Sequence, residues 1–574
     1  MKRVFIFLTL LGMMSGMMYA QSISKKSYRA EIIAKGGYYL SSGTPSGSIE
    51  AMLAARKFGC YASSCTVMLT DDKQLVVVLG AERLKIEKNM TVEQLKKNGF
   101  WVMPVEEYFV KYTGGQKSQA PQPSALRIVG DNVLSVNENG DMDEKLNAKM
   151  RLVLNVHASD SRRQMEMIGL LKKLVRVHGL SEKVEFASTD LELCRLLAEN
   201  FQKSRVTYMQ GDLSPKAISK RAGEIGCQYD YETLRDNPNW FKEAKALKMP
   251  VWVGDVHNKL EVKEMLEKGV NGFLTENVAL VSAWAERKPL VKLMSFNIRM
   301  SGMSEYDGVN AWKNREEAVV RMFKEQNPDV VGVQEMLPDQ QAFLRKELRE
   351  YNMVGLGRDD GQKEGECMGI FYKTDRFALK DSGTFWLSQT PESASMGWDA
   401  ACKRTVTYVK LKDMQSGKSF YYFNTHLDHV GKIARQESVK LIAEKIREIV
   451  GDTNSVFVLG GDMNSPVYDR IFTPIVGAPT PDRKNTSDFA ISKVSNAART
   501  EANNGALMKI CRSNAWQRDN SITYNGYGKD KASQIDHLFS SIPTENLVFK
   551  TLKKDYGVPY ISDHYPIILI FSLK

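Results

Sequence analysis

The sequence predicts an α/β protein of two domains, a (β/α)8 barrel followed by a sandwich of two sheets with helices outside. Its length of 574 residues exceeds what one hydrophobic core usually serves, so two or more domains are expected. From residue 28 to 285, short β-rich runs alternate with helical patterns. From residue 290, apolar runs end in polar motifs instead, which indicates a second kind of α/β architecture.

The first domain, residues 28–285, contains about eight strand-and-helix units, which is typical of a closed barrel of the TIM type. Residues 162–177 and 260–269 carry clear helical patterns between strands. Residues 113–124 are rich in Gly, Pro and Gln and predict a surface loop. The expected strands are AEIIAKG, CTVML, QLVVVLG, RLVLNV, KVEFAS, RVTYMQ, GCQYDY, PVWVGDV and NGFLTE.

The second domain, residues 290–574, mixes strands and helices with hairpin-like pairs near its end, which favours two packed sheets with helices outside. Residues 315–326 and 434–450 predict its clearest helices. The first of these ends before Asn327 and Pro328, because proline cannot continue a helix.

Residues 1–20 have the pattern of a signal peptide. Lys2 and Arg3 precede an apolar run from Val4 to Met18, and a cleavage point follows Ala20. This run is too short for a membrane anchor, and no other stretch could span a bilayer. We therefore expect an exported protein, periplasmic or extracellular, without stable membrane insertion. Its seven cysteines have scattered spacing and are expected to be buried thiols rather than a disulfide framework.

The net charge of +11 lies mostly in the first half of the chain. Such an excess can attract nucleic acid or anionic lipid. No run of Lys and Arg is interleaved with aromatic residues, however, so an ordinary solvated basic surface is the favoured interpretation.

Six short polar motifs follow one another in the second half: SFNIR, GVQE, FNTHLDH, GGDMN, QIDH and SDH. All but the last two directly follow a strand-forming apolar run, so their side chains are expected to converge where strands end. Each motif alone is compatible with a structural role, but four of the seven histidines lie inside the set. Together the motifs present Asn297, Glu335, Asn424, His426, Asp462, Asn464, Asp536, Asp563 and His564.

These residue types suit the hydrolysis of a phosphate ester. Asn424 and His426 are two residues apart in a strand and project to the same face, and GGDMN repeats this spacing. The oxygens of Glu335 and Asn297 suit a hard divalent cation and leave positions for water and phosphate. The attacking water needs a base, and imidazoles can donate hydrogen bonds to the phosphoryl oxygens.

The ordered motif set resembles the endonuclease/exonuclease/phosphatase superfamily, which is deoxyribonuclease I-like, over the whole second half. The resemblance implies a four-layer α/β sandwich and a metal-dependent phosphoric ester hydrolase that uses Mg2+, or Mn2+ in its place. Arg299 stands where abasic-site endonucleases carry an acidic residue, which weakens a DNA-repair function. The resemblance assigns metal binding to Asn297, Glu335 and Asp563, catalysis to His426, Asp462, Asn464, Asp536 and His564, and substrate binding to Asn424 and Arg404.

The first half resembles the glycerophosphodiester phosphodiesterase family, best in PVWVGDVHNKLEVKEMLEKGVNGFLTEN, which matches that family's final strand-helix-strand segment. The catalytic residues of that family are replaced. Lys35 and Gly36 stand in place of its first histidine and arginine, and Ser46 in place of a glutamate. Ser64 and Thr66 stand in place of its metal-binding Glu and Asp. The resemblance therefore implies a barrel without phosphodiesterase activity.

The sequence thus predicts an exported Mg-dependent phosphoesterase, with a phosphodiesterase favoured, that acts by metal-assisted attack of water on phosphorus. Nucleic acid, a phospholipid headgroup and a sugar phosphate all stay open as substrates. One alternative is a non-catalytic protein that binds a phosphate ligand or a surface. Another is glycerophosphodiester hydrolysis by the barrel. Nothing in the sequence identifies a protein partner.

Overall fold

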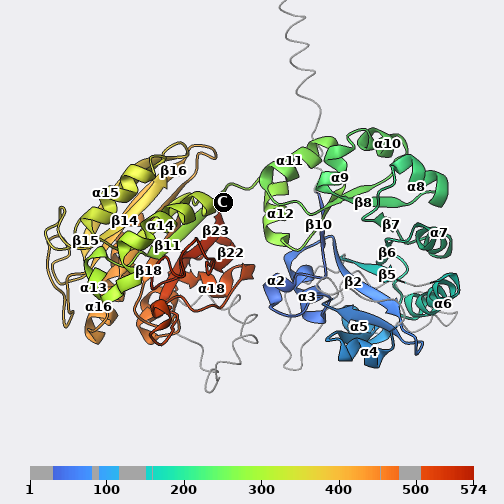
Figure 1. Ribbon diagram of the computed structural model, residues 1–574, viewed down its shortest axis with the longest axis horizontal. Helices are drawn as coiled ribbons and strands as arrows, with labels where there is room; N and C mark the ends of the chain where they lie inside the picture. The colour runs from blue at the N-terminus through green and yellow to red at the C-terminus, as the bar shows by residue number, and fades with distance from the viewer. Residues whose placement is uncertain are drawn as a thin grey trace, which may run out of the picture.

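The computed structural model describes residues 30–80, 90–114, 150–157, 160–452, 454–477 and 506–573. The predicted signal peptide and most of the predicted loop at 113–124 lie outside these ranges. Figure 1 shows two bodies side by side, the first half of the chain in blue to green and the second in yellow-green to red. Every helix in the described ranges is too short or too polar to cross a bilayer.

Eight parallel strands close the first half into a barrel. Their order is β1-β10-β9-β8-β7-β6-β5-β2, and the pairing of Ile33 in β1 with Ala62 in β2 closes the ring. The predicted (β/α)8 barrel is therefore confirmed. The strands are β1 (Glu31–Ala34), β2 (Ala62–Leu69), β5 (Arg151–His157), β6 (Val184–Ser188), β7 (Val206–Met209), β8 (Gly226–Asp230), β9 (Val251–Gly254) and β10 (Gly272–Thr275).

One of the expected strands lies outside the ring. The run QLVVVLG forms β3 (Leu75–Leu79), which pairs antiparallel with β2, and β4 (Trp101–Pro104) pairs antiparallel with β3. The helices of the first half are α2 (Tyr39–Ser42), α3 (Ile49–Phe58), α4 (Val92–Lys97), α5 (Val105–Tyr112), α6 (Ser161–Val177), α7 (Leu191–Asn200), α8 (Pro215–Ala222), α9 (Tyr231–Asp236), α10 (Trp240–Ala246), α11 (Lys259–Lys268) and α12 (Val278–Ala285).

Local sequence signals set the ends of the barrel helices. The side chain of Asp160 accepts the backbone N–H of Arg163 and so caps the start of α6. Asn258 caps α11 in the same way, by accepting the backbone N–H of Leu260 and of Glu261. Helix α11 then ends at Gly269, whose φ of 87° is a left-handed conformation that glycine adopts without strain.

Two sheets form the second half. The seven-stranded sheet has the order β13-β14-β12-β11-β23-β22-β20, and the six-stranded sheet has the order β15-β16-β17-β18-β21-β19. Their strands are β11 (Leu290–Asn297), β12 (Val330–Met336), β13 (Tyr351–Val354), β14 (Cys367–Lys373), β15 (Phe377–Trp386), β16 (Thr405–Asp413), β17 (Ser419–His426), β18 (Val456–Asp462), β19 (Met508–Ile510), β20 (Gln517–Arg518), β21 (Asp536–Ser541), β22 (Glu545–Thr551) and β23 (Ile567–Ser572).

Three apolar cores hold these sheets and their helices in four layers. Leu293, Val458 and Phe571 belong to the core between the two sheets. Helices α14 (Trp312–Gln326) and α15 (Pro338–Glu347) pack on the outer face of the seven-stranded sheet. Helix α16 (Lys432–Val450) packs on the outer face of the six-stranded sheet. The predicted four-layer α/β sandwich is therefore confirmed.

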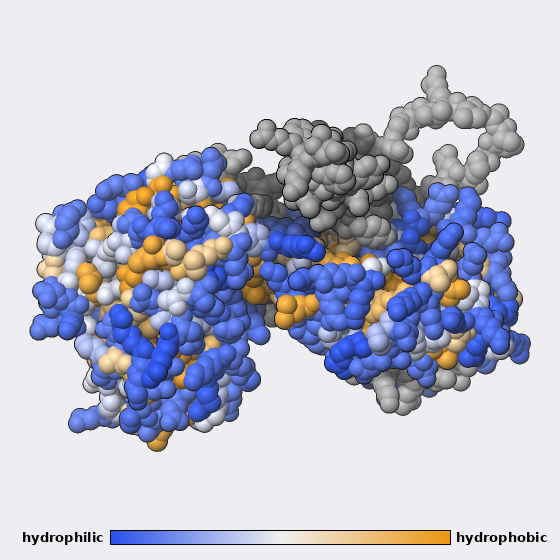
Figure 2. Space-filling model, turned by 90° about the horizontal axis from the view of Figure 1, so that it is seen from above, coloured by the Kyte–Doolittle hydropathy of each residue, from blue (hydrophilic) through white to orange (hydrophobic). Residues whose placement is uncertain are grey.

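The two halves meet through an apolar seam. The Trp516 ring lies edge-on to Phe58, with centroids 4.8 Å apart, and stacks with Tyr38 at 6.4 Å. Leu547 and Val548 of β22 are part of the same apolar cluster as the barrel core. Figure 2 shows that the remaining surface, seen from above, is mostly hydrophilic, with apolar side chains in small groups.

We expect the substitution Trp516→Ala to destabilise the full chain by about 2 kcal/mol, because it removes a half-buried aromatic ring from the seam. Thermal unfolding followed by calorimetry measures the change. The matched control is Trp101→Ala, since the Trp101 side chain is 71% exposed. Equal midpoints for Trp516→Ala and the wild type would contradict a stabilising seam.

Candidate active site

The predicted site residues lie where strands of the two sheets end. In the six-stranded sheet, His426 at the end of β17 pairs with Asp462 at the end of β18, which pairs with Asp536 at the start of β21. Gly461 makes this close pairing possible, because a Cβ atom there would lie 1.8 Å from the carbonyl oxygen of Thr425. The register of three strands thus sets an imidazole and two carboxylates in one row.

The seven-stranded sheet contributes Asn297 and Glu335. Asn297 ends β11, and Glu335 lies in β12 at a break in the register with β14. The φ angle of Glu335 is 61°, a left-handed conformation that is strained for a residue other than glycine. The bulge turns this carboxylate out of the regular alternation of the strand.

The Asn297 amide joins the two sheets. Its Nδ2 donates to Oε1 of Glu335 at 2.9 Å and to Oδ2 of Asp462 at 3.0 Å. Its Oδ1 accepts the backbone N–H of Arg299 at 3.0 Å. One neutral amide therefore holds two carboxylates from different sheets close together.

His564 is paired with two carboxylates. Its Nδ1 lies 2.8 Å from Oδ2 of Asp536, and its Nε2 lies 3.5 Å from Oδ2 of Asp462. Burial alone would lower the pKa of His564, but the charges of Asp536 and Asp462 outweigh it and raise that pKa well above its usual range. The two carboxylates therefore favour the imidazolium form of His564.

His426 has the opposite charge state. Burial, and then the positive charge of Arg404, lower the pKa of His426 well below its usual range. Its Nε2 lies 3.0 Å from Nδ2 of Asn464, an amide nitrogen that can only donate, so Nε2 accepts this hydrogen bond. A neutral and a charged imidazole thus lie on either side of Asp462, each at 3.5 Å from its Oδ2.

The carboxylates of the site repel one another. Burial, and then Asp536, raise the pKa of Asp462 to about 7. Burial, and then Glu335, raise the pKa of Glu366 to about 7 as well. Burial also raises the pKa of Asp563. Buried oxygen donors that destabilise one another as anions are the set that a hard divalent cation stabilises.

Two groups of possible ligand atoms have members within 4.8 Å of one another in this region. One group is Glu335, His426 and Asp462, and the other is Asp462, Asp536 and His564. The histidine of each group is already engaged, because His564 is bound to Asp536 and Nε2 of His426 accepts from Asn464. The carboxylates are therefore the ligands suited to a cation. The residues present therefore fit a divalent cation near Glu335 and Asp462.

Asn424 is not brought to the site. It is fully buried, its Nδ2 donates to the carbonyls of Val333 and Gly369, and its Oδ1 accepts from Gln334. The amide therefore ties β17 to the opposite sheet. Both N–H donors of Asn424 are thus used within the protein.

Arg404 and Asp563 do lie near the row that His426, Asp462 and Asp536 form. Arg404 is 5% exposed, and its positive charge acts on both His426 and Glu366. Asp563 accepts a hydrogen bond from Ser562 and lies 3.8 Å from Nη1 of Arg299.

Glu366 also lies at the site, although no sequence motif predicts it. This residue is 4% exposed, lies 3.8 Å from Nδ1 of His426, and accepts a hydrogen bond from Nη1 of Arg358 at 2.7 Å. It directly precedes the buried strand β14. A charged residue at the border of an apolar run is the sequence signal that could have identified it.

His537, the third histidine of the motifs, has a structural position. Its Nε2 donates to the carbonyl of Ser465 at 2.8 Å, and its ring packs edge-on against Phe472. Burial lowers the pKa of His537 to about 4.

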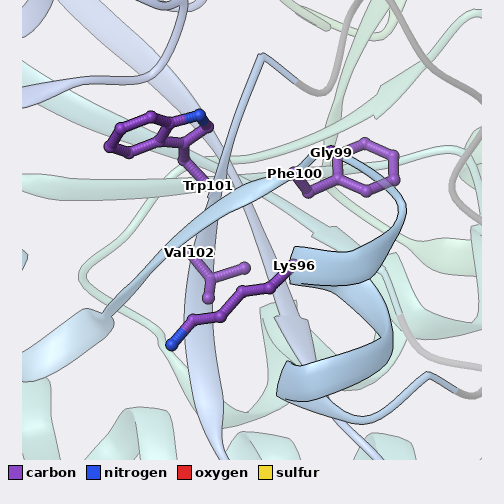
Figure 3. Close-up of a pocket in the computed structure, with 5 residues that line it drawn as sticks. All are labelled: Lys96, Gly99, Phe100, Trp101 and Val102. Atoms are coloured by element: carbon purple, nitrogen blue, oxygen red, sulfur yellow. The ribbon is translucent and has the colours of Figure 1, made fainter.

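The replaced positions of the barrel are engaged in internal contacts. Ser64 Oγ accepts the backbone N–H of Gly36 at 3.0 Å, and Nζ of Lys35 lies 3.7 Å from Glu276. A surface pocket of about 290 Å³ lies elsewhere in this half, beside β4 (Figure 3). Its lining has one charged side chain and no carboxylate, which does not suit metal-assisted hydrolysis; it consists of Lys96, Gly99, Phe100, Trp101 and Val102.

Comparisons with known proteins agree with this geometry. Residues 294–564 match the Endonuclease/Exonuclease/phosphatase family, which confirms the predicted resemblance of the second half. The uncharacterized protein L388 of Acanthamoeba polyphaga mimivirus is 23% identical over 294 residues, which are 49% of this chain and 100% of that protein.

Two solved structures are similar to parts of the chain. An endonuclease/exonuclease/phosphatase from Bacteroides vulgatus is 32% identical, with 50% of this chain and 100% of that chain covered and a TM-score of 0.43. A glycerophosphodiester phosphodiesterase from Parabacteroides distasonis is 22% identical, with 45% of this chain and 98% of that chain covered and a TM-score of 0.36.

We expect His537 to make stability depend on pH. Because its folded pKa is below the unfolded value, its neutral form stabilises the fold above about pH 6.5, and this contribution is lost as pH falls toward 4. Relative to the variant His537→Asn, the wild type should lose about 2 kcal/mol between pH 7.5 and pH 5. Urea unfolding of both proteins at the two pH values measures this, and a pH-independent difference would contradict it.

Proposed function

We propose that the second half of this chain, which matches the endonuclease/exonuclease/phosphatase family of phosphoric ester hydrolases, cleaves a phosphate ester by metal-assisted attack of water. The observation that supports this most strongly is the row of Asp462 between a neutral His426 and a charged His564. A group that takes up a proton and a group that donates one are thereby held at one place.

Each residue of the row has a task in this mechanism. Asp462 orients the attacking water and accepts its proton, since its Oδ1 is fixed by the backbone N–H of Asn464 at 3.0 Å. The charged His564 donates from Nε2 to a phosphoryl oxygen, and Asp536 holds its ring in place. The neutral His426 fixes the amide of Asn464 beside the water.

Glu335 would hold the cation, with Asn297 and Asp563 beside it. When bound, the cation supplies positive charge that polarises the phosphoryl group. The oxygen-rich donor set favours Mg2+, or Mn2+, over softer metals. Export to the periplasm or outside the cell is also part of this proposal, on the strength of the basic and apolar pattern of residues 2–20.

A phosphodiester is the proposed substrate, and its class is to be found by a screen. The full chain would be tested on DNA, RNA, phospholipid headgroups, inositol phosphates and sugar phosphates, with Mg2+ and with a chelator. We expect product release that the chelator abolishes. Release from glycerophosphodiesters that survives loss of His564 would point to the barrel instead.

Replacing His564 or His426 with alanine should lower kcat by at least about 100-fold, because the first change removes a donor to the phosphoryl oxygen and the second frees the amide of Asn464 beside the water. Steady-state kinetics on the substrate found in the screen measures this. The matched control is His257→Ala, an exposed histidine of the barrel half. Full activity in both site variants would refute the proposed mechanism.

Replacing Glu335 with glutamine should raise the Mg2+ concentration needed for half-maximal activity by about 10-fold or more, because one charged ligand is lost. Isothermal titration with Mg2+ checks the same change without turnover. Glu317→Gln is the control, since the Glu317 side chain is 83% exposed on α14. An unchanged Mg2+ requirement in Glu335→Gln would place the cation elsewhere.

A further inference from the structure

Arg404 is a buried cation beside the proposed site. It directly precedes β16, whose Val406 pairs with Thr425 of β17, one residue before His426. The Arg404 side chain is only 5% exposed. A guanidinium this buried needs partners for its charge and for its N–H groups, or it would destabilise the fold.

Two residues of the turn after β17 supply those partners. Nε of Arg404 donates to Oδ2 of Asp428 at 3.4 Å, and Nη2 lies 3.1 Å from Nδ1 of His429. Arginine has only donors, so Nδ1 of His429 accepts and its proton is on Nε2. In the described structure Nη1 of Arg404 is buried without a partner, which makes it the donor available to a ligand.

Asp428 is itself held rigidly. Its Oδ1 accepts the backbone N–H groups of Val430 at 3.0 Å and Gly431 at 2.7 Å, and its Oδ2 accepts that of Ala401 at 3.2 Å. These N–H groups come from two different loops. A carboxylate fixed from both sides fixes the plane of the guanidinium that binds it.

We propose that Asp428 and His429 are positioning residues that orient Arg404, so that Nη1 donates to a phosphoryl oxygen of the substrate. The proposal rests on the proposed function, since it assigns Arg404 to the same phosphate. It also explains why two residues of the FNTHLDH motif lie outside the catalytic row.

A metal site is the competing explanation for this cluster. Ligand atoms of Cys402, Asp428 and His429 lie within 4.8 Å of one another. However, Arg404 lies 3.4 Å from Oδ2 of Asp428, and its Nη2 occupies the lone pair of His429. A second cation there would meet a fixed positive charge at short range, so the guanidinium fills the place of a metal.

The chain offers a matched control for the test. Arg376 donates from Nε to Asp413 at 3.2 Å, and Asp413 is fully buried at the other end of β16. Asp413→Asn therefore breaks a comparable buried pair in the same sheet, away from the site. Any effect common to Asp413→Asn and Asp428→Asn reflects structure alone.

In the full chain with saturating Mg2+, we expect Arg404→Ala to lower kcat/KM by about 100-fold. Asp428→Asn should lower it by about 10-fold, and the double variant should lose no more than Arg404→Ala alone. Added guanidinium should restore activity to Arg404→Ala but not to the double variant. A loss in the double variant equal to the product of the two single losses would overturn the positioning role. A loss in Asp413→Asn as large as that in Asp428→Asn would overturn it as well.

Inorganic phosphate tests the same contact without turnover. Titration calorimetry in Mg2+ should show about 10-fold weaker phosphate binding in Asp428→Asn than in the wild type or Asp413→Asn. Equal phosphate affinity in all three would overturn the proposal. If Asp428→Asn alone weakens phosphate binding but the wild type hydrolyses no ester, the proposed function is wrong and the positioning role stands. Stoichiometric Zn2+ binding that Cys402→Ser abolishes would favour the metal site.

Discussion

Repulsion between buried carboxylates is the constraint around which the second half of the chain is arranged. Asp462, Glu366 and Asp563 all lie where burial and neighbouring charge disfavour the ionised form. A fold that brings such groups together must offset that cost with donors. Asn297 does so with one amide shared by two carboxylates, and His564 does so with a full positive charge.

These donors offset only part of the repulsion between the carboxylates, since the pKa of Asp462 and that of Glu366 are still raised. The site therefore suits a divalent cation. Glu335 lies among these carboxylates, and the sheet around it maintains its strained backbone. The surroundings of His426 and His564 shift the pKa values of these two identical side chains in opposite directions. Burial, and then arginine charge, lower the pKa of His426, whereas two carboxylates raise the pKa of His564.

The order of motifs along the chain was enough to predict the four-layer sandwich and most of the residues that meet in the site. The order of motifs does not predict which side of a strand another element covers. Asn424 and His426 share one strand, but the opposite sheet covers Asn424 completely. Glu366 was missed because it stands before its strand rather than after it. Similarly, β3 was recognised as a strand, but apolar runs do not reveal which neighbour they pair with.

The apolar seam has a consequence for the barrel. Active sites of (β/α)8 barrels lie at the carboxyl ends of their strands. Tyr38 follows β1 at that end, and it stacks with Trp516 of the second half. This stacking ties the segment after β1 to the second half of the chain. A substitution at this edge of the barrel therefore reaches the second half through the ring of Trp516.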